Sequence, residues 1–174
     1  HGQEWDSARR YLAEAEGLGR EVNRELGRVY LREGRLSEAR PRLERAVALR
    51  PRDWNAWGDL GLLAYEEGRY GEAVQRLEES LELHAYRPAL RRSLARALDK
   101  DGRSAEGFYH LAWAAEAEGH IVQAHAYYEK AAAGLAEGSR LKAEADKKVE
   151  EMAKRLPRKS ALPSRKPPAD RVSP

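Results

Sequence analysis

The chain has 174 residues, a length typical of one domain, and a formal net charge of +3. It contains no cysteine, which excludes a disulfide framework, a thiolate nucleophile and a cysteine-ligated zinc site. No stretch approaches the run of about eighteen apolar residues that a membrane-spanning helix needs, so we expect no direct membrane insertion.

The positive charge is concentrated at the C-terminal end. Residues 157–174 contain five Lys or Arg and a single Asp, so the rest of the chain is close to neutral. Mixed charge of this kind is typical of solvated helix surfaces and not of a body that neutralises phosphates. We expect no nucleic-acid partner; binding through the basic tail ranks last because its cations have no interleaved aromatic side chains.

The dipeptide Gly-Arg recurs about every 34 residues, beginning at Gly34, Gly68 and Gly102. Other positions keep the same spacing, namely Leu26, Leu60 and Leu94, and then Leu43, Leu77 and Leu111. A period of this length is typical of a solenoid of stacked helix pairs, each too small to bury its own apolar face.

Residues 3–16 are predicted to form a second helix without its first helix. Their apolar positions Trp5, Ala8, Leu12 and Ala15 match Leu36, Ala39, Leu43 and Ala46. A solenoid that begins on a half-unit exposes an unfinished face. We therefore expect a piece of a longer polypeptide, with more protein before Gly2; the alternative is an N-terminal capping helix.

Two regular units are predicted at 20–52 and 54–86. Each half-unit is about fourteen residues, too short to persist alone in water, so helix packing must stabilise it. Gly34 is placed to end a first helix in the left-handed conformation, and Ser37 and Asp53 are placed to cap the helices that follow.

These two units resemble the tetratricopeptide repeat (TPR). The resemblance rests on Asn23-x-x-Leu26-Gly27-x-x-Tyr30 with Ala39-x-x-x-Leu43-x-x-Ala46, and on Trp57-x-x-Leu60-Gly61-x-x-Ala64 with Ala73-x-x-x-Leu77-x-x-Ser80. It covers about residues 3–135. It implies an all-α, right-handed TPR-type solenoid of antiparallel helix pairs, with a concave face that binds a segment of another protein.

The remainder of the chain is less regular. Residues 88–135 form irregular repeats, in which the helix at 104–118 fits both a second helix and the first helix of a new unit. Residues 139–156, capped by Ser139, have one narrow apolar stripe and are predicted to be a C-terminal capping helix that completes a solenoid over 1–156. Residues 157–174 are Pro-rich and basic, and we expect them to be disordered.

No catalytic or metal site is predicted. His120 and His125 are five positions apart and do not share a helix face, and no His-Glu-x-x-His is present. No Gly-rich phosphate loop appears, and the carboxylates alternate with Lys and Arg. We therefore expect no enzyme and no cofactor.

The candidate peptide-binding groove lies on the exposed face of the first helices. Its residues are Arg24, Arg28, Arg32, Asn55, Leu62, Tyr65, Arg92, Arg96, Lys100, Tyr109 and Trp113. Arginines four apart point the same way on a helix and bind carboxylates bidentately. The set resembles the carboxylate clamp of chaperone-binding TPR domains, although no asparagines stand beside the cations.

Two alternatives remain at these positions. The arginines can simply pair with neighbours such as Glu21, Glu25 and Asp99. The aromatic side chains of Tyr65, Tyr109 and Trp113 can equally belong to the core.

The preferred function is a non-catalytic scaffold that binds a mildly acidic protein or peptide segment, with self-association through the unfinished ends as a further possibility. A looser resemblance, through Gly-Phe-Tyr-His-Leu-Ala at 107–112, connects the chain to C-terminal TPR arrays of bacterial membrane-associated zinc metalloproteases. It implies the alternative of a domain that docks substrates or partners within such a larger protein.

Overall fold

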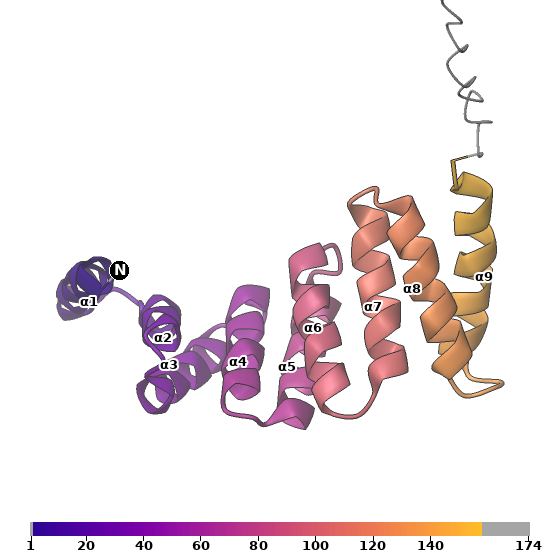
Figure 1. Ribbon diagram of the computed structural model, residues 1–174. Coiled ribbons are helices and arrows are strands. Elements are labelled where there is room, and N and C mark those ends of the chain that lie inside the picture. Colours follow the sequence, from indigo (N-terminus) through magenta and orange to yellow (C-terminus); the bar gives the residue numbers. More distant parts are fainter. Residues whose placement is uncertain (1, 158–174) are drawn as a thin grey trace, which may run out of the picture.

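The computed structural model describes residues 2–157, in which every regular element is an α-helix (Figure 1). The helices in this part of the chain are α1 (Gly2–Gly17), α2 (Asn23–Arg32), α3 (Leu36–Leu49), α4 (Trp54–Glu66), α5 (Tyr70–Leu83), α6 (Pro88–Lys100), α7 (Ser104–Ala117), α8 (Ile121–Gly134) and α9 (Arg140–Arg155). The predicted all-α repeat fold is confirmed. None of these helices has both the length and the apolar character needed to cross a membrane. His1 and 158–174, hence nearly all of the segment expected to be disordered, lie outside the described residues.

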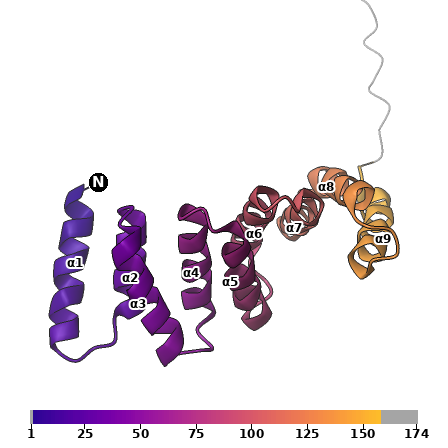
Figure 2. The same cartoon turned by 90° about the horizontal axis from the view of Figure 1, so that it is seen from below.

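The helices lie side by side in an open array and do not close into a globular bundle (Figures 1 and 2). In Figure 1, α1 is viewed nearly down its axis while α9 lies in the plane of the picture. Figure 2, turned by 90°, shows α1 from the side and α7 nearly end-on. The helix axes therefore turn steadily along the array, as in a superhelix.

Loops of two kinds connect the helices from α2 to α8. The turns after α2, α4, α6 and α7 each contain a glycine with positive φ, between 75° at Gly34 and 83° at Gly102. A side chain is strained in this left-handed conformation, which explains why glycine recurs there. The loops at 50–53 and 84–87, between helix pairs, contain no glycine.

Two of the three predicted helix caps are present. The side chain of Asp53 accepts from the backbone N–H groups of Asn55 and Ala56, and Ser139 accepts from Lys142 N–H. The predicted cap by Ser37 is wrong. Because α3 begins at Leu36, Ser37 is already inside the helix, and its hydroxyl donates instead to the carboxylate of Glu38 at 2.8 Å.

Within each regular pair, the helices cross at a glycine. A Cβ added to Gly27 would lie 2.6 Å from Leu43, and one added to Gly61 would lie 2.7 Å from Leu77. Such distances are far below van der Waals contact, so the close approach of the two helices requires glycine at these positions.

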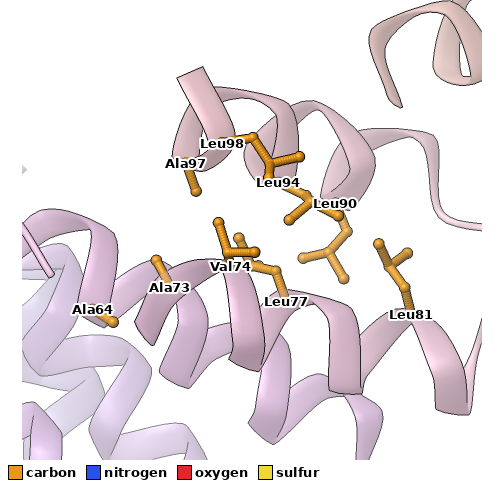
Figure 3. Packing of buried hydrophobic residues seen from close by; sticks show 9 residues of the cluster. All are labelled: Ala64, Ala73, Val74, Leu77, Leu81, Leu90, Leu94, Ala97 and Leu98. Atoms are coloured by element: carbon orange, nitrogen blue, oxygen red, sulfur yellow. The ribbon is translucent and has the colours of Figure 1, made fainter. Parts of the chain in front are cut away.

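Between successive pairs, an apolar layer joins the second helix to the next first helix. Figure 3 shows Leu77 and Leu81 of α5 facing Leu90 and Leu94 of α6. All four are buried. Layers of this kind stabilise helices that are individually too short to persist.

The helix α7 is shared by two pairs. It packs closely against both α6 and α8, and glycine-containing turns precede and follow it. On one side, a Cβ added to Gly107 would lie 2.9 Å from the carbonyl oxygen of Ala95 in α6. On the other, Ala112 belongs to the same buried cluster as Tyr128 of α8. Both registers suggested by the sequence are therefore used at once.

Candidate functional site

The first helices α2, α4 and α6 lie next to one another, since α2 contacts α4 and α4 contacts α6. A hollow of about 540 Å³ opens between α2 and α4. Among the predicted groove residues, Arg28, Arg32 and Leu62 line it, together with the carboxylates of Asp59 and Glu66. We call this the α2–α4 hollow.

Asp59 holds two of the arginines in place. Its Oδ2 accepts from Arg24 Nε at 3.0 Å and lies 3.7 Å from Arg28 Nε. Burial raises the pKa of Asp59 to about 6, against the opposing effect of these two guanidinium groups. Two cations thus share this carboxylate, and Arg24 also lies 3.7 Å from the carboxylate of Glu25.

Two further charged groups at the hollow remain available. Neither Arg32 nor Glu66 forms an ion pair within residues 2–157, although both line the hollow and both are exposed. The lining contains two guanidinium groups, of Arg28 and Arg32, and two carboxylates, of Asp59 and Glu66. The α2–α4 hollow is therefore balanced in charge, with one free group of each sign.

The second row of predicted cations, on α6, lies elsewhere. The guanidinium of Arg96 covers the ring of Tyr65 at 4.9 Å, and Tyr65 in turn packs edge-on against Tyr70 at 5.5 Å. Arg92 pairs with Glu118, whereas Lys100 is exposed and forms no ion pair within the described part of the chain.

Arg96 borders a smaller hollow of about 250 Å³ between α6 and α7, which shares no lining residue with the α2–α4 hollow. The sequence predicts one groove lined by both rows of cations. The structure instead gives two separate hollows, because the stacked side chains of Arg96 and Tyr65 occupy the surface between α4 and α6.

The remaining predicted groove residues lie away from the α2–α4 hollow. Tyr109 is a core residue, only 6% exposed, with its ring centre 5.7 Å from that of Tyr128. Trp113 packs between Arg91, at 4.0 Å, and Tyr86, at 5.5 Å. Asn55 is in the first turn of α4 and does not line the hollow.

The main residue that the sequence analysis missed is Asp59. Arg24 does lie 3.7 Å from Glu25, one of the neighbours considered, but its hydrogen bond goes to Asp59, 35 residues away in the next unit. The repeat carries a signal that could have found it. Asp59 holds the position of Glu25 one period later, which places a carboxylate on the same face of the adjacent first helix.

Within the described residues, no group of three or more His, Asp or Glu side chains is arranged to hold a metal ion. His110 is half-buried beside Arg91, whose Nη1 lies 3.2 Å from its Nδ1. Burial first, and then the charge of Arg91, lowers the pKa of His110 to about 4, so this imidazole is neutral near pH 7.

Comparison with known proteins agrees with this architecture. Residues 24–88 match the family model of the tetratricopeptide repeat. A search of curated protein sequences gave no match.

Three solved structures illustrate the similarity. MamA of AMB-1 has a TM-score of 0.58 and 24% identity, covering 68% of this chain and 70% of that chain. MamA of MSR-1 has a TM-score of 0.51 and 23% identity, covering 77% of this chain and 76% of that chain. TTC0263, a thermophilic TPR protein of Thermus thermophilus, has a TM-score of 0.45 and 16% identity, covering 84% of this chain and 99% of that chain. The likeness to the two MamA structures concerns the fold.

Proposed function

The chain contains tetratricopeptide repeats, which in general serve as scaffolds for protein–protein contacts, and we propose that the α2–α4 hollow binds a segment of a partner protein that carries acidic side chains. The observation that carries this proposal is the charge arrangement. Arg28 shares Asp59 with Arg24, and Arg32 beside it has no ion pair within the described residues.

The chemistry favours carboxylate ligands. Guanidinium groups bind carboxylates through two parallel hydrogen bonds and are less strongly hydrated than ammonium groups, so an arginine pair suits an acidic side chain. Leu62 adds apolar contact within the same hollow, and the free carboxylate of Glu66 favours a segment that also carries a cation. The expected ligand is therefore a polar segment with an acidic residue, an apolar residue and a basic residue.

The rigidity of the surface supports binding. The side chain of Asp59 on α4 is only 15% exposed. It pairs with both Arg24 and Arg28 of α2, so the two arginines are held in place before any ligand arrives. A preformed surface leaves only the ligand to be ordered, which reduces the entropic cost of association. Because exposed charges take part, the affinity should fall as the salt concentration rises.

The test uses peptides selected from a random display library on the immobilised protein, with affinities measured by fluorescence anisotropy. We expect acidic residues to be enriched among the selected peptides. Arg32→Glu and Leu62→Glu should each weaken binding about tenfold or more, because the first reverses a free charge and the second buries an unpaired one.

Arg45→Glu is the matched control, since Arg45 is exposed on α3, forms no ion pair in the described region and lies outside the hollow. It should leave the affinity unchanged. Arg96→Glu alters the hollow between α6 and α7, so its effect on affinity shows whether a peptide binds there instead. Selected peptides that bind Arg32→Glu and Leu62→Glu as tightly as the unmodified protein would refute the proposal.

A further inference from the structure

Arg28 of α2 depends on a single carboxylate. Within the described residues it pairs with Asp59 alone, at 3.7 Å. Arg24 lies 3.0 Å from Asp59 as well, but it also has Glu25, 3.7 Å away on its own helix. Loss of the negative charge on Asp59 would therefore leave Arg24 with a partner and Arg28 without one.

Asp59 occupies the space that a ligand's carboxylate would enter. It lines the α2–α4 hollow together with Arg28 and Arg32. A carboxylate brought into this hollow competes with Asp59 for Arg28, and the two negative charges repel each other while both are ionised. Asp59 thus opposes the binding of an acidic segment as long as it carries its charge.

The charges that act on Asp59 come from the first helices on either side of α4 in the chain. Arg24 and Arg28 face it from α2, and the third is Arg87, the residue that precedes α6. Burial has the largest effect and raises the pKa of Asp59 to about 6, against the opposing charges of these arginines. On α4 itself, Glu66 lines the same hollow and forms no ion pair within 2–157. Asp59 therefore changes its charge close to neutral pH.

The other two helices that pack against α4 make their charged contacts with it elsewhere. Arg40 of α3 pairs with Glu67 at the end of α4, and the guanidinium of Arg76 on α5 covers the ring of Trp57 at 5.3 Å. None of these four side chains lines the α2–α4 hollow. The charge of Asp59 is therefore governed by its burial and by the arginines around it.

We propose that Asp59 is a pH switch of the α2–α4 hollow: when its carboxylate takes up a proton, Arg28 is released and becomes available to a carboxylate of the bound segment. The inference rests on the proposed function, since it describes the regulation of that same surface. An acidic segment accordingly binds more tightly at mildly acidic pH than at alkaline pH.

The direction of the pH effect follows from the effect of the ligand on Asp59. A carboxylate beside Asp59 disfavours its ionised form, so the pKa of Asp59 is higher in the complex than in the free protein. The complex then holds the proton more tightly, and the affinity rises as pH falls from about 8 to about 6, below which the free protein is protonated as well. Contact between arginine and an ordinary carboxylate has no such dependence, because both stay charged over this range.

The probe is an acidic peptide selected at pH 7 from the display library, acetylated at its N-terminus and free of histidine, so that it has no group of its own that titrates near neutral pH. Isothermal titration calorimetry measures its affinity at pH 5.5 and pH 8, at constant ionic strength. The unmodified protein should bind about tenfold more tightly at pH 5.5, which corresponds to a rise of about one unit in the pKa of Asp59 on binding.

Asp59→Asn removes the ionisable group and keeps the size of the side chain. This variant should bind the peptide equally well at both pH values, and at pH 8 as tightly as the unmodified protein does at pH 5.5. Glu66→Gln is the matched control, because it neutralises the other carboxylate of the hollow. The tenfold difference between the two pH values should persist in it. Circular dichroism shows whether each variant is folded.

A second measurement needs no variant. Titrations at pH 6.5 in two buffers of different ionisation enthalpy give the number of protons that the complex takes up as it forms. We expect on the order of half a proton per peptide, because Asp59 is mostly ionised in the free protein and mostly protonated in the complex at this pH.

The outcomes separate the inference from the proposed function. Equal affinities of the unmodified protein at the two pH values, binding without proton uptake, or a pH dependence that persists in folded Asp59→Asn would each overturn the inference and leave the proposed function intact. Selected peptides whose binding is insensitive to Arg32→Glu and Leu62→Glu would refute the proposed function, and the inference with it.

Discussion

The two halves of the array, α2–α5 and α6–α9, pack the same repeat in different ways. In α2–α5, each first helix contacts the next one, the helix pairs cross closely at Gly27 and Gly61, and the α2–α4 hollow is open. In α6–α9, α7 serves two pairs, α6 and α8 have no comparable contact, and aromatic rings of Tyr109 and Tyr128 fill the space between helices. The repeat therefore leaves the α2–α4 hollow open where first helices are neighbours and buries aromatic rings where one helix is shared.

Each half also contains one carboxylate that joins several helices. In the first half, Asp59 of α4 binds Arg24 and opens onto the α2–α4 hollow. In the second, Glu116 of α7 accepts from Tyr128 at 2.9 Å and from both Lys148 and Arg155 of α9 at 3.1 Å. One carboxylate lies at the α2–α4 hollow, and the other joins the last helix to the array.

Removing Tyr128 should give the largest effect, because it disrupts the closed half at its centre. Its side chain is fully buried, and its hydroxyl donates to Glu116. Tyr128→Ala should lower the free energy of unfolding by about 3–5 kcal/mol, as for other large-to-small core changes. Tyr128→Phe, which removes only the hydroxyl, should cost about 1–2 kcal/mol. Urea unfolding followed by circular dichroism measures both; a Tyr128→Ala variant as stable as Tyr128→Phe would show that the ring is not packed.

Adding one methyl group should test the crossing in the open half. Gly61→Ala places a Cβ 2.7 Å from Leu77, and the overpacking should cost about 1–3 kcal/mol. Gly71→Ala on α5 is the control. The nearest atom to its new Cβ is Asp101 Oδ1 at 3.5 Å, so the better helix propensity of alanine should leave stability unchanged or raise it by about 0.5–1 kcal/mol. If both variants have the same stability in urea, the helices do not cross as closely as described.

Acid should affect the two halves in opposite directions. The pKa of Asp59 is about 6 in the fold, above the ordinary aspartate value, so the folded state binds its proton more tightly and this group's contribution to stability declines as pH rises from about 4 to 6. The pKa of His110 is about 4, below the ordinary value, so its contribution is complete above about pH 6.5 and is lost as pH falls toward 4.

When unfolding free energies are plotted against pH from 4 to 7, the slope should therefore change in each variant by an amount on the order of 1 kcal/mol per pH unit. Asp59→Asn should remove a contribution that stabilises the fold at low pH. His110→Asn should remove a contribution that stabilises the fold at high pH. Variants whose pH dependence parallels that of the unmodified protein would contradict the burial of these groups.

Local features were predictable from the sequence because their causes are local. Gly34 has the left-handed conformation that a helix-ending turn needs, and Asp53 and Ser139 cap the helices that follow them. The repeat period also predicted the all-α array. Ser37 failed as a cap because the helix begins one residue before it, a difference that spacing alone does not resolve.

The candidate site was harder to predict because its contacts join separate units. Helical spacing placed Arg24 and Arg28 on one face, but only the stacking of α2 on α4 brings Asp59 to them. Tyr109 matched no regular core position in either register, yet the sharing of α7 between two pairs buries it. In the irregular part of a repeat array, helix packing decides which residues are buried, and the repeat period alone does not predict it.

The proposal that the α2–α4 hollow binds a partner segment can be tested at Leu62, which lines the hollow. The chain has no cysteine, so Leu62→Cys and Arg45→Cys each introduce one unique thiol. With a saturating concentration of a selected acidic peptide, maleimide labelling of the thiol at position 62 should slow markedly while labelling at position 45 stays unchanged. Equal labelling rates at position 62 with and without the bound peptide would contradict binding at the α2–α4 hollow.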